Sequence, residues 1–293
     1  IGVFAAIYHP VGIAMLIQSN QRIGFRLGVN GVFGNMGVAA APLLIGILLT
    51  VGDWRLCFAV SGLFCIAYGF AFVMALDGDA PSPSRSAKRG SSGFAPNWKL
   101  ALGAMLLSTA SGGFIFGAMT FVVPRYFEIS LTGISTSVAM TGLLAAIVYA
   151  VASFSQVSVG WLIDRVPPKW VLMAIGAGQI VFVALTALYT DYALFFAMLV
   201  AMSFVFGQIP ITDTILSRYV PDDWRARILS MKFMVNLSIG ASVLPICGAI
   251  LQNGYEMAFL FSVMSGLACL VVLAALLLPV QSEAHRLDRQ PAE

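Results

Sequence analysis

The run FLFSVMSGLACLVVLAALLL, residues 259–278, carries no charged side chain and is long enough for one helical crossing of a bilayer. Similar runs fill the rest of the chain, and in order the predicted spans are 1–18, 27–50, 54–76, 99–123, 136–163, 169–189, 193–218, 228–251 and 256–279. In hydrocarbon, a helix satisfies its own backbone polar groups. The sequence therefore predicts an all-α integral membrane protein with about nine transmembrane helices.

The composition supports a lipid environment. Of the 293 residues, 59% are hydrophobic and only 10% are charged, and the mean hydropathy is +0.92. A water-soluble fold of this size needs more charge on its surface. The sequence holds no metal-ligand cluster, phosphate-binding loop or nucleophile–base set, so we expect neither an enzyme nor a bound cofactor. The cysteines Cys57, Cys65, Cys247 and Cys269 lie in apolar runs without paired spacing, as buried small hydrophobes do.

Basic residues alternate between the loops as the positive-inside rule requires. One set falls on alternate loops or helix ends, which we assign to the cytoplasmic, inner side: Arg22, Arg26, Arg85, Lys88, Arg89, Lys99, Arg165, Lys169, Arg218, Arg225, Arg227, Arg286 and Arg289. The outer side holds Arg55 and Arg125, and Lys232 remains inside a predicted span. We therefore expect a cytoplasmic tail at 280–293, and the net charge of +3 needs no nucleic-acid partner to explain it.

A polar segment divides the spans into two groups. Residues 77–98, rich in Pro, Ser, Gly and basic residues, are predicted to be a flexible cytoplasmic linker between a region 1–76 and a region 99–279. At a shift of 203 residues, the first region resembles the end of the second: Arg22 matches Arg225, Gly37 matches Gly240, Pro42 matches Pro245 and Phe58 matches Phe261. Three spans before the linker and six after it, with Ile1 inside an apolar run, lead us to expect three further helices upstream.

The segment GWLIDRVPPKW, residues 160–170, joins two spans on the inner side. A carboxylate there can cap the amino terminus of a neighbouring helix, and basic residues can hold it in place. The alternative interpretation is a tight turn with inside-positive charges. The spacing of Gly160, Asp164, Arg165 and Lys169 resembles the loop signature of the major facilitator superfamily, although two prolines replace its usual small residues. The resemblance implies that these four residues form a conformational switch, in which Asp164 caps the helix beginning near 26–28.

A second stretch, residues 28–46, resembles the antiporter signature of that superfamily. Gly28, Gly37, Pro42 and Gly46 match it, while two other glycines of the signature are replaced. Small residues let helix backbones approach closely, and a proline permits a bend. The match favours export, and the alternative is ordinary helix packing.

The resemblance covers the whole chain. It implies a bundle of two six-helix halves around a central cavity, lined here by the spans 1–18, 99–123 and 193–218. It also implies a monomeric secondary active transporter of a bacterial inner membrane, coupled to protons, that moves a small organic molecule by alternating access. Uptake of a metabolite is the alternative to export. A transporter-like sensor or assembly partner is the alternative from another functional class.

Ionisable groups at membrane depth are functional candidates because their burial is costly. His9 lies near the midplane of the first span, where it can carry a proton, bind substrate, or bond to a neighbouring backbone as a neutral side chain. Asp213 and Lys232 lie at similar depth on adjacent spans, and we predict that they pair in the transport path. The alternative is that each extends separately to the inner edge of the membrane.

Hydroxyl, amide and aromatic side chains mark the expected cavity wall. The candidates on one lining span are Ser108, Thr109, Ser111 and Phe114, and those on the other are Gln208 and Thr212. Few fixed charges and several aromatic rings favour a neutral or amphipathic substrate. Packing between helices is the alternative role of these residues.

Overall fold

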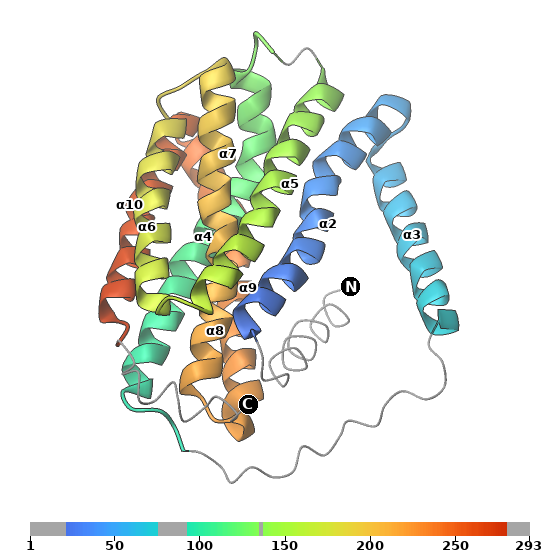
Figure 1. Ribbon diagram of the computed structural model, residues 1–293. Helices are drawn as coiled ribbons and strands as arrows, with labels where there is room; N and C mark the ends of the chain where they lie inside the picture. Colours follow the sequence, from blue (N-terminus) through green and yellow to red (C-terminus); the bar gives the residue numbers. More distant parts are fainter. Residues whose placement is uncertain (1–21, 76–92, 135–136, 280–293) are drawn as a thin grey trace.

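The computed structural model describes residues 22–75, 93–134 and 137–279, and these parts form a bundle of long helices without any strand (Figure 1). The helices are α2 (Ile23–Val51), α3 (Trp54–Ala75), α4 (Trp98–Ser130), α5 (Val138–Ile163), α6 (Pro168–Thr186), α7 (Asp191–Gly207), α8 (Ile209–Tyr219), α9 (Asp222–Gln252) and α10 (Met257–Leu277). The predicted all-α membrane architecture is confirmed.

Eight stretches within these parts are long and apolar enough to cross a membrane, because α7 and α8 together form one crossing, Asp191–Tyr219. They correspond to all the predicted spans except 1–18, which lies outside the described residues together with His9, as do the linker residues 76–92 and the tail 280–293. The helices extend beyond several predicted spans. The helix predicted from residue 99 ends at Ser130 instead of 123, because its apolar period continues past Pro124.

The span predicted as one helix over 193–218 is interrupted at Gln208, between α7 and α8. Pro210, near the start of α8, has no backbone N–H to continue the helical ladder, and the N–H of Ile211 donates instead to the Gln208 carbonyl at 3.2 Å. Residues 210–217 are all buried. Irregular backbone at membrane depth is tolerated where protein surrounds it, and here it is surrounded.

We name the end of the bundle that carries Asp164 inner and the opposite end outer, after the orientation expected from the loop charges. The core consists of two clusters stacked along the bundle. The outer one gathers large side chains from α4, α5, α7 and α10, among them Phe127, Tyr149, Phe206 and Phe261. The inner one gathers residues of α4, α5, α6 and α8, among them Met105, Ile163, Leu172 and Ile215. Because close packing is a main source of helix association in lipid, these clusters position the helices of the second half relative to one another.

Helices α2 and α5 lie side by side along most of their length (Figure 1). Glycines allow the contact, because a Cβ added at Gly28 would overlap the Gln156 carbonyl and one at Gly160 would overlap the Gly24 carbonyl. Towards the outer end, Gly46 packs against the backbone of α5. Backbones therefore meet directly, as in other small-residue contacts between membrane helices.

The antiporter-like stretch is not uniform in this respect. Gly28 and Gly46 lie at the α2–α5 contact, and the Pro42 carbonyl lies so close to Gly142 that a Cβ there would overlap it. Gly37 instead faces open space, with no atom within 4 Å of a Cβ built on it. Only part of the stretch serves helix packing.

Helices α3 and α9 are the least buried. Cys57 is the one buried residue of α3, and the described buried side chains of α9 are Leu229, Lys232, Val243 and Cys247. Both helices belong to the repeat found in the sequence. The start of α3 at Trp54 matches the start of α10 at Met257, 203 residues later. Pro42 of α2 and Pro245 of α9 keep the same shift.

We predict that Gly28→Ala lowers the thermal unfolding midpoint of the protein in detergent. The added methyl group meets backbone that cannot yield without separating α2 from α5, and overpacking of this kind costs about 1–3 kcal/mol. Gly34→Ala is the matched control, because it lies on the same helix with no atom within 4 Å of its Cβ. It should leave the midpoint unchanged or raise it, since Ala favours a helix. Equal midpoints for the two variants would contradict the packing analysis.

Candidate functional site

The carboxylate of Asp164, which follows the last residue of α5, caps the amino terminus of α2. Its Oδ1 accepts the N–H of Gly24 at 2.8 Å and its Oδ2 accepts the N–H of Phe25 at 2.9 Å. The first N–H groups of a helix have no partner within it, and the helix dipole attracts a negative charge there. Arg22, at the N-cap position, provides no side-chain cap of its own. We call this contact of Asp164 with Gly24 and Phe25 the inner latch.

The basic residues of the same loop do not hold Asp164, contrary to our expectation. The Arg165 guanidinium lies 3.8 Å from the ring centroid of Trp161 and donates to the Trp161 carbonyl at 3.0 Å. Lys169 donates to the Leu276 carbonyl at the end of α10, also at 3.0 Å. Both cations thus bind carbonyls near helix carboxyl termini, where the helix dipole attracts positive charge. They anchor the loop to α5 and α10.

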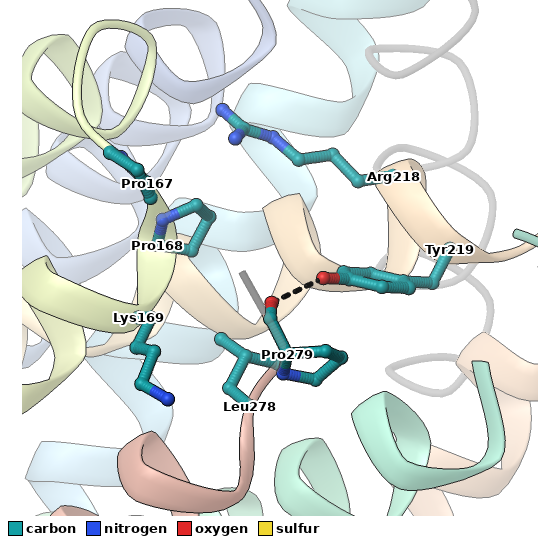
Figure 2. Close-up of a pocket in the computed structure, with 7 residues that line it drawn as sticks. All are labelled: Pro167, Pro168, Lys169, Arg218, Tyr219, Leu278 and Pro279. Carbon is teal, nitrogen blue, oxygen red and sulfur yellow. Dashed lines mark hydrogen bonds between the residues drawn. The ribbon is translucent and has the colours of Figure 1, made fainter. Parts of the chain in front are cut away.

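Further bonds close the inner end of the bundle. The Tyr219 hydroxyl donates to the Pro279 carbonyl at 2.8 Å (Figure 2). Arg218 donates to the Ile163 carbonyl at 2.5 Å. A pocket lined by Arg218, Tyr219, Pro279 and Lys169, among others, has a volume of about 10 Å³ (Figure 2). That is room for about one water molecule. This pocket is therefore too small to hold an organic molecule.

A hydrogen-bonded cluster of amides lies at the break between α7 and α8. The Gln208 amide nitrogen donates to the Ser108 carbonyl at 2.9 Å and to the Ser108 hydroxyl at 2.8 Å. Its oxygen accepts the Gln179 amide at 2.8 Å. Gly112 leaves the necessary room, since a Cβ there would overlap the Gln208 amide. The cluster ties α4, α6 and the break together in the interior.

The other predicted wall residues mostly bond within their own helices. Ser111 donates to the Leu107 carbonyl at 2.8 Å and Thr212 to the Ile209 carbonyl at 3.2 Å. The Thr109 hydroxyl is buried without a partner among the described residues. Phe114 is half-buried and packs against the outer core cluster. A hydroxyl that donates to a carbonyl of its own helix does not need an acceptor on a neighbouring helix.

Asp213 of α8 and Lys232 of α9 form an ion pair between Oδ1 and Nζ. Their side chains are 6% and 8% exposed. The sequence-based alternative, in which each extends separately to the inner edge, does not describe this state. Two opposite charges are joined inside the protein at the depth of the inner core.

The large cavity lies in the outer half, between α2, α4 and α5, and has a volume of about 1010 Å³. Its wall includes Gly37 and Pro42 of α2, Thr120 of α4 and Tyr149 of α5. The Tyr149 hydroxyl donates to the Thr120 carbonyl at 3.0 Å. At the exposed mouth Arg125 pairs with Glu128 at 2.6 Å. Most of the wall is apolar. The described charged side chains in it are Arg125 and Glu128, whose opposite charges cancel.

The predicted path residues on α4, α8 and α9 do not line this cavity. Asp213 and Lys232 lie in the closed inner half, whereas Gly37, Pro42 and Gly46 of the antiporter-like stretch form part of the wall. Sequence reasoning also missed Gln156, which is fully buried in α5 beside Gly28, with no hydrogen-bond partner for its amide among the described residues. The signal in the sequence that could have found Gln156 is a polar amide side chain inside an apolar span.

Comparison with known proteins came to the same architecture. The family model described as Major Facilitator Superfamily matches residues 1–236 and 131–293. Among solved structures, a variant of the E. coli fucose:proton symporter FucP aligns over 94% of this chain and 74% of its own, with a TM-score of 0.62 and 13% identity. FucP in an outward conformation aligns over 94% and 72%, with a TM-score of 0.61 and 13% identity. Among proteins with curated descriptions, none matched the sequence.

We predict that Asp164→Asn opens the inner side more often. The change removes the negative charge and one acceptor of the inner latch, worth about 1–2 kcal/mol, or roughly tenfold in the open fraction. A reporter cysteine at Leu27, which is 4% exposed in the inner core cluster, should then react roughly tenfold faster with a thiol reagent applied from the inner side. The four native cysteines are first replaced by alanine.

Asp53→Asn is the matched control. Asp53 also caps a helix start, accepting the N–H of Arg55 at 3.0 Å, but it does so within its own turn at the outer side. Its variant should react at the parent rate. Equal reporter rates in the parent and in Asp164→Asn would exclude a latching role for Asp164.

Proposed function

Because this chain belongs to the Major Facilitator Superfamily, we propose that it is a proton-coupled secondary transporter that moves a small neutral or amphipathic organic molecule by alternating access. Membership agrees with the expectation from the sequence that the chain is a membrane transporter and not an enzyme. Beyond family membership, we propose the coupling to protons, the class of substrate and the transport cycle.

One observation carries the proposal: the bundle is closed at its inner end and holds a large cavity in its outer half. At the inner end, α2 is held to α5 by the inner latch and by glycine contacts. In the outer half, a cavity of about 1010 Å³ lies between α2, α4 and α5. An alternating-access cycle needs such a state, in which a central space is open to one side only.

The cavity wall supports the substrate class. A small-molecule site is commonly apolar with a few polar groups that fix orientation. Here Thr120, Thr141 and Tyr149 supply the polar groups, and Arg125 and Glu128 neutralise each other at the mouth. A wall of this kind favours a neutral or amphipathic solute over a strongly charged one, because a lone charge would enter it without a counter-ion.

In the proposed cycle, the inner latch releases and the solute enters from the inner side past the hydrogen-bonded cluster of Gln208, Ser108 and Gln179. The latch then re-forms, the outer ends of α2 and α4 separate, and the solute leaves through the cavity. A ligand shifts such an equilibrium only by its differential affinity for the two states. We further propose export from the cytoplasm of a bacterium, with the protein as a monomer in the inner membrane, a direction supported by the antiporter-like stretch from Gly28 to Gly46.

We predict that a large side chain in the cavity blocks transport without unfolding the protein. Gly37→Trp projects into the cavity from a position with no atom within 4 Å of its Cβ. In vesicles containing the full-length protein, flux of labelled amphipathic solutes driven by a pH gradient should fall by about tenfold or more, as loss of a well-formed site requires.

Gly62→Trp is the matched control, because Gly62 also has no neighbouring atom within 4 Å but lies on the exposed helix α3, away from the cavity. It should transport at the parent rate with the same unfolding midpoint. Equal flux in the two tryptophan variants would place the path elsewhere. Absence of gradient-driven flux in the parent protein, across a broad set of solutes, would contradict the proposed function.

A further inference from the structure

We propose that Asp213 binds the coupling proton of this transporter and that Lys232 is the internal cation that holds its carboxylate ionised while the inner side is closed. The inference rests on the proposed function, since it assigns the coupling proton to a site. It concerns an ion pair on α8 and α9 that lies apart from the large cavity and from the inner latch.

The pair stands out by its burial. By contrast, the side chains of the ion pairs Arg55–Asp53 and Arg125–Glu128 are about half exposed or more. Asp213 and its partner are below one tenth. Taking two charges out of water is costly, and replacing a buried pair by apolar residues often stabilises a protein. A contribution to stability therefore does not explain why this pair is buried. Ionisable groups inside a membrane protein commonly mark ion or proton paths.

Among the described side chains, Lys232 is the charged group seen to pair with Asp213. Helix α8 packs against α2, α4, α5, α6, α7 and α9. Other charged side chains that the structure describes on or next to these helices have contacts elsewhere. Lys99 lies over the Trp98 ring, Arg125 pairs with Glu128, and Asp164 caps Gly24 and Phe25. Arg165 lies over the Trp161 ring, Lys169 contacts Leu276, Asp191 accepts from Gly133, Arg218 contacts Ile163, Arg225 contacts Ser217 and Arg227 lies over the Trp224 ring. Arg22, Arg26 and Asp223 are exposed.

Protonation breaks this balance. A proton from water adds to a carboxylate oxygen of Asp213 and converts it to a neutral carboxylic acid, and no other bond is made or broken. The Lys232 ammonium then lies in the interior without a counter-charge, which is unfavourable until it reaches water. Helix α9 can move for this purpose, because little of its surface is packed against the rest of the described chain. The proton-bound form therefore favours a state in which Lys232 meets water at the inner side.

Helix α8 connects this event to the inner latch. Asp213 and Arg218 lie on the same short, buried helix, and Arg218 donates to the carbonyl of Ile163, the residue before Asp164. A displacement of α8 that follows the loss of the ion pair pulls on the end of α5. Helix α8 thus joins the proton site to the contact that closes the inner side, and both bias one two-state equilibrium.

Labelling of the Leu27 reporter tests the proposal without any substrate. The full-length protein in vesicles is equilibrated at mildly alkaline or mildly acidic pH, and the reporter is labelled from the inner side with a thiol reagent. Its rate is divided by that of a second reporter at Met74, which is 84% exposed, so that the effect of pH on thiol chemistry cancels. In the parent, acidification should raise this ratio roughly tenfold, as expected when a minor state becomes the main one.

The variants then separate the roles. Asp213→Asn imitates the proton-bound carboxyl and should give the high ratio at both pH values. Asp213→Asn with Lys232→Met removes both buried charges, is expected to fold, and should keep the low ratio at both pH values. Asp53→Asn, which alters an exposed pair, should keep the full pH response. A retained pH response in the first two variants, with unchanged unfolding midpoints, would overturn the assignment of the proton to Asp213.

The outcome is distinguishable from failure of the proposed function. If gradient-driven solute flux occurs in the parent and persists in Asp213→Asn, the protein is a transporter whose coupling proton binds elsewhere. If the parent shows neither flux nor a pH response of the reporter, the proposed function itself fails.

Discussion

The close approach of α2 and α5 is the constraint on which the rest of this structure depends. Two helices can meet backbone to backbone only where side chains are missing, and Gly24, Gly28, Gly142 and Gly160 provide such places along the contact. The approach brings the first N–H groups of α2 within reach of Asp164. It also leaves the cavity between α2 and α4, because a helix held along one side of α5 cannot at the same time close the outer gap to α4.

Polar groups in the interior fall into three classes by how they are satisfied. The Gln208 cluster is bonded across helices, and the pair of Asp213 and Lys232 is neutralised across two. The Gln156 amide has no partner among the described residues, although it lies within the α2–α5 contact. An unsatisfied buried group costs about 1–3 kcal/mol. Gln156 therefore weakens the contact in which it lies, and this suits a contact that opens in the proposed cycle.

Much of the fold follows from residue patterns that are local. Apolar runs of membrane length predicted every described span, since length and hydropathy suffice to place a helix in lipid. The motif at 160–170 predicted a helix cap by Asp164, because a carboxylate at a loop is a good partner for free N–H groups. Patterns of this kind could not reveal the break at Gln208. Pro210 alone is compatible with a kinked but continuous helix, and only the neighbouring helices that accept the freed groups decide otherwise.

By itself the sequence determined the helical membrane class, the inside-positive orientation expected for it, the repeat at 203 residues and the identity of the ionisable groups at membrane depth, because each is a property of composition or spacing. Tertiary structure alone decided the partners. Arg165 and Lys169 bind helix carboxyl termini instead of Asp164, and Ser108 bonds to Gln208 instead of lining the cavity. The reason is that a side chain's partner depends on which helices lie next to each other, and that is settled by packing across distant parts of the chain.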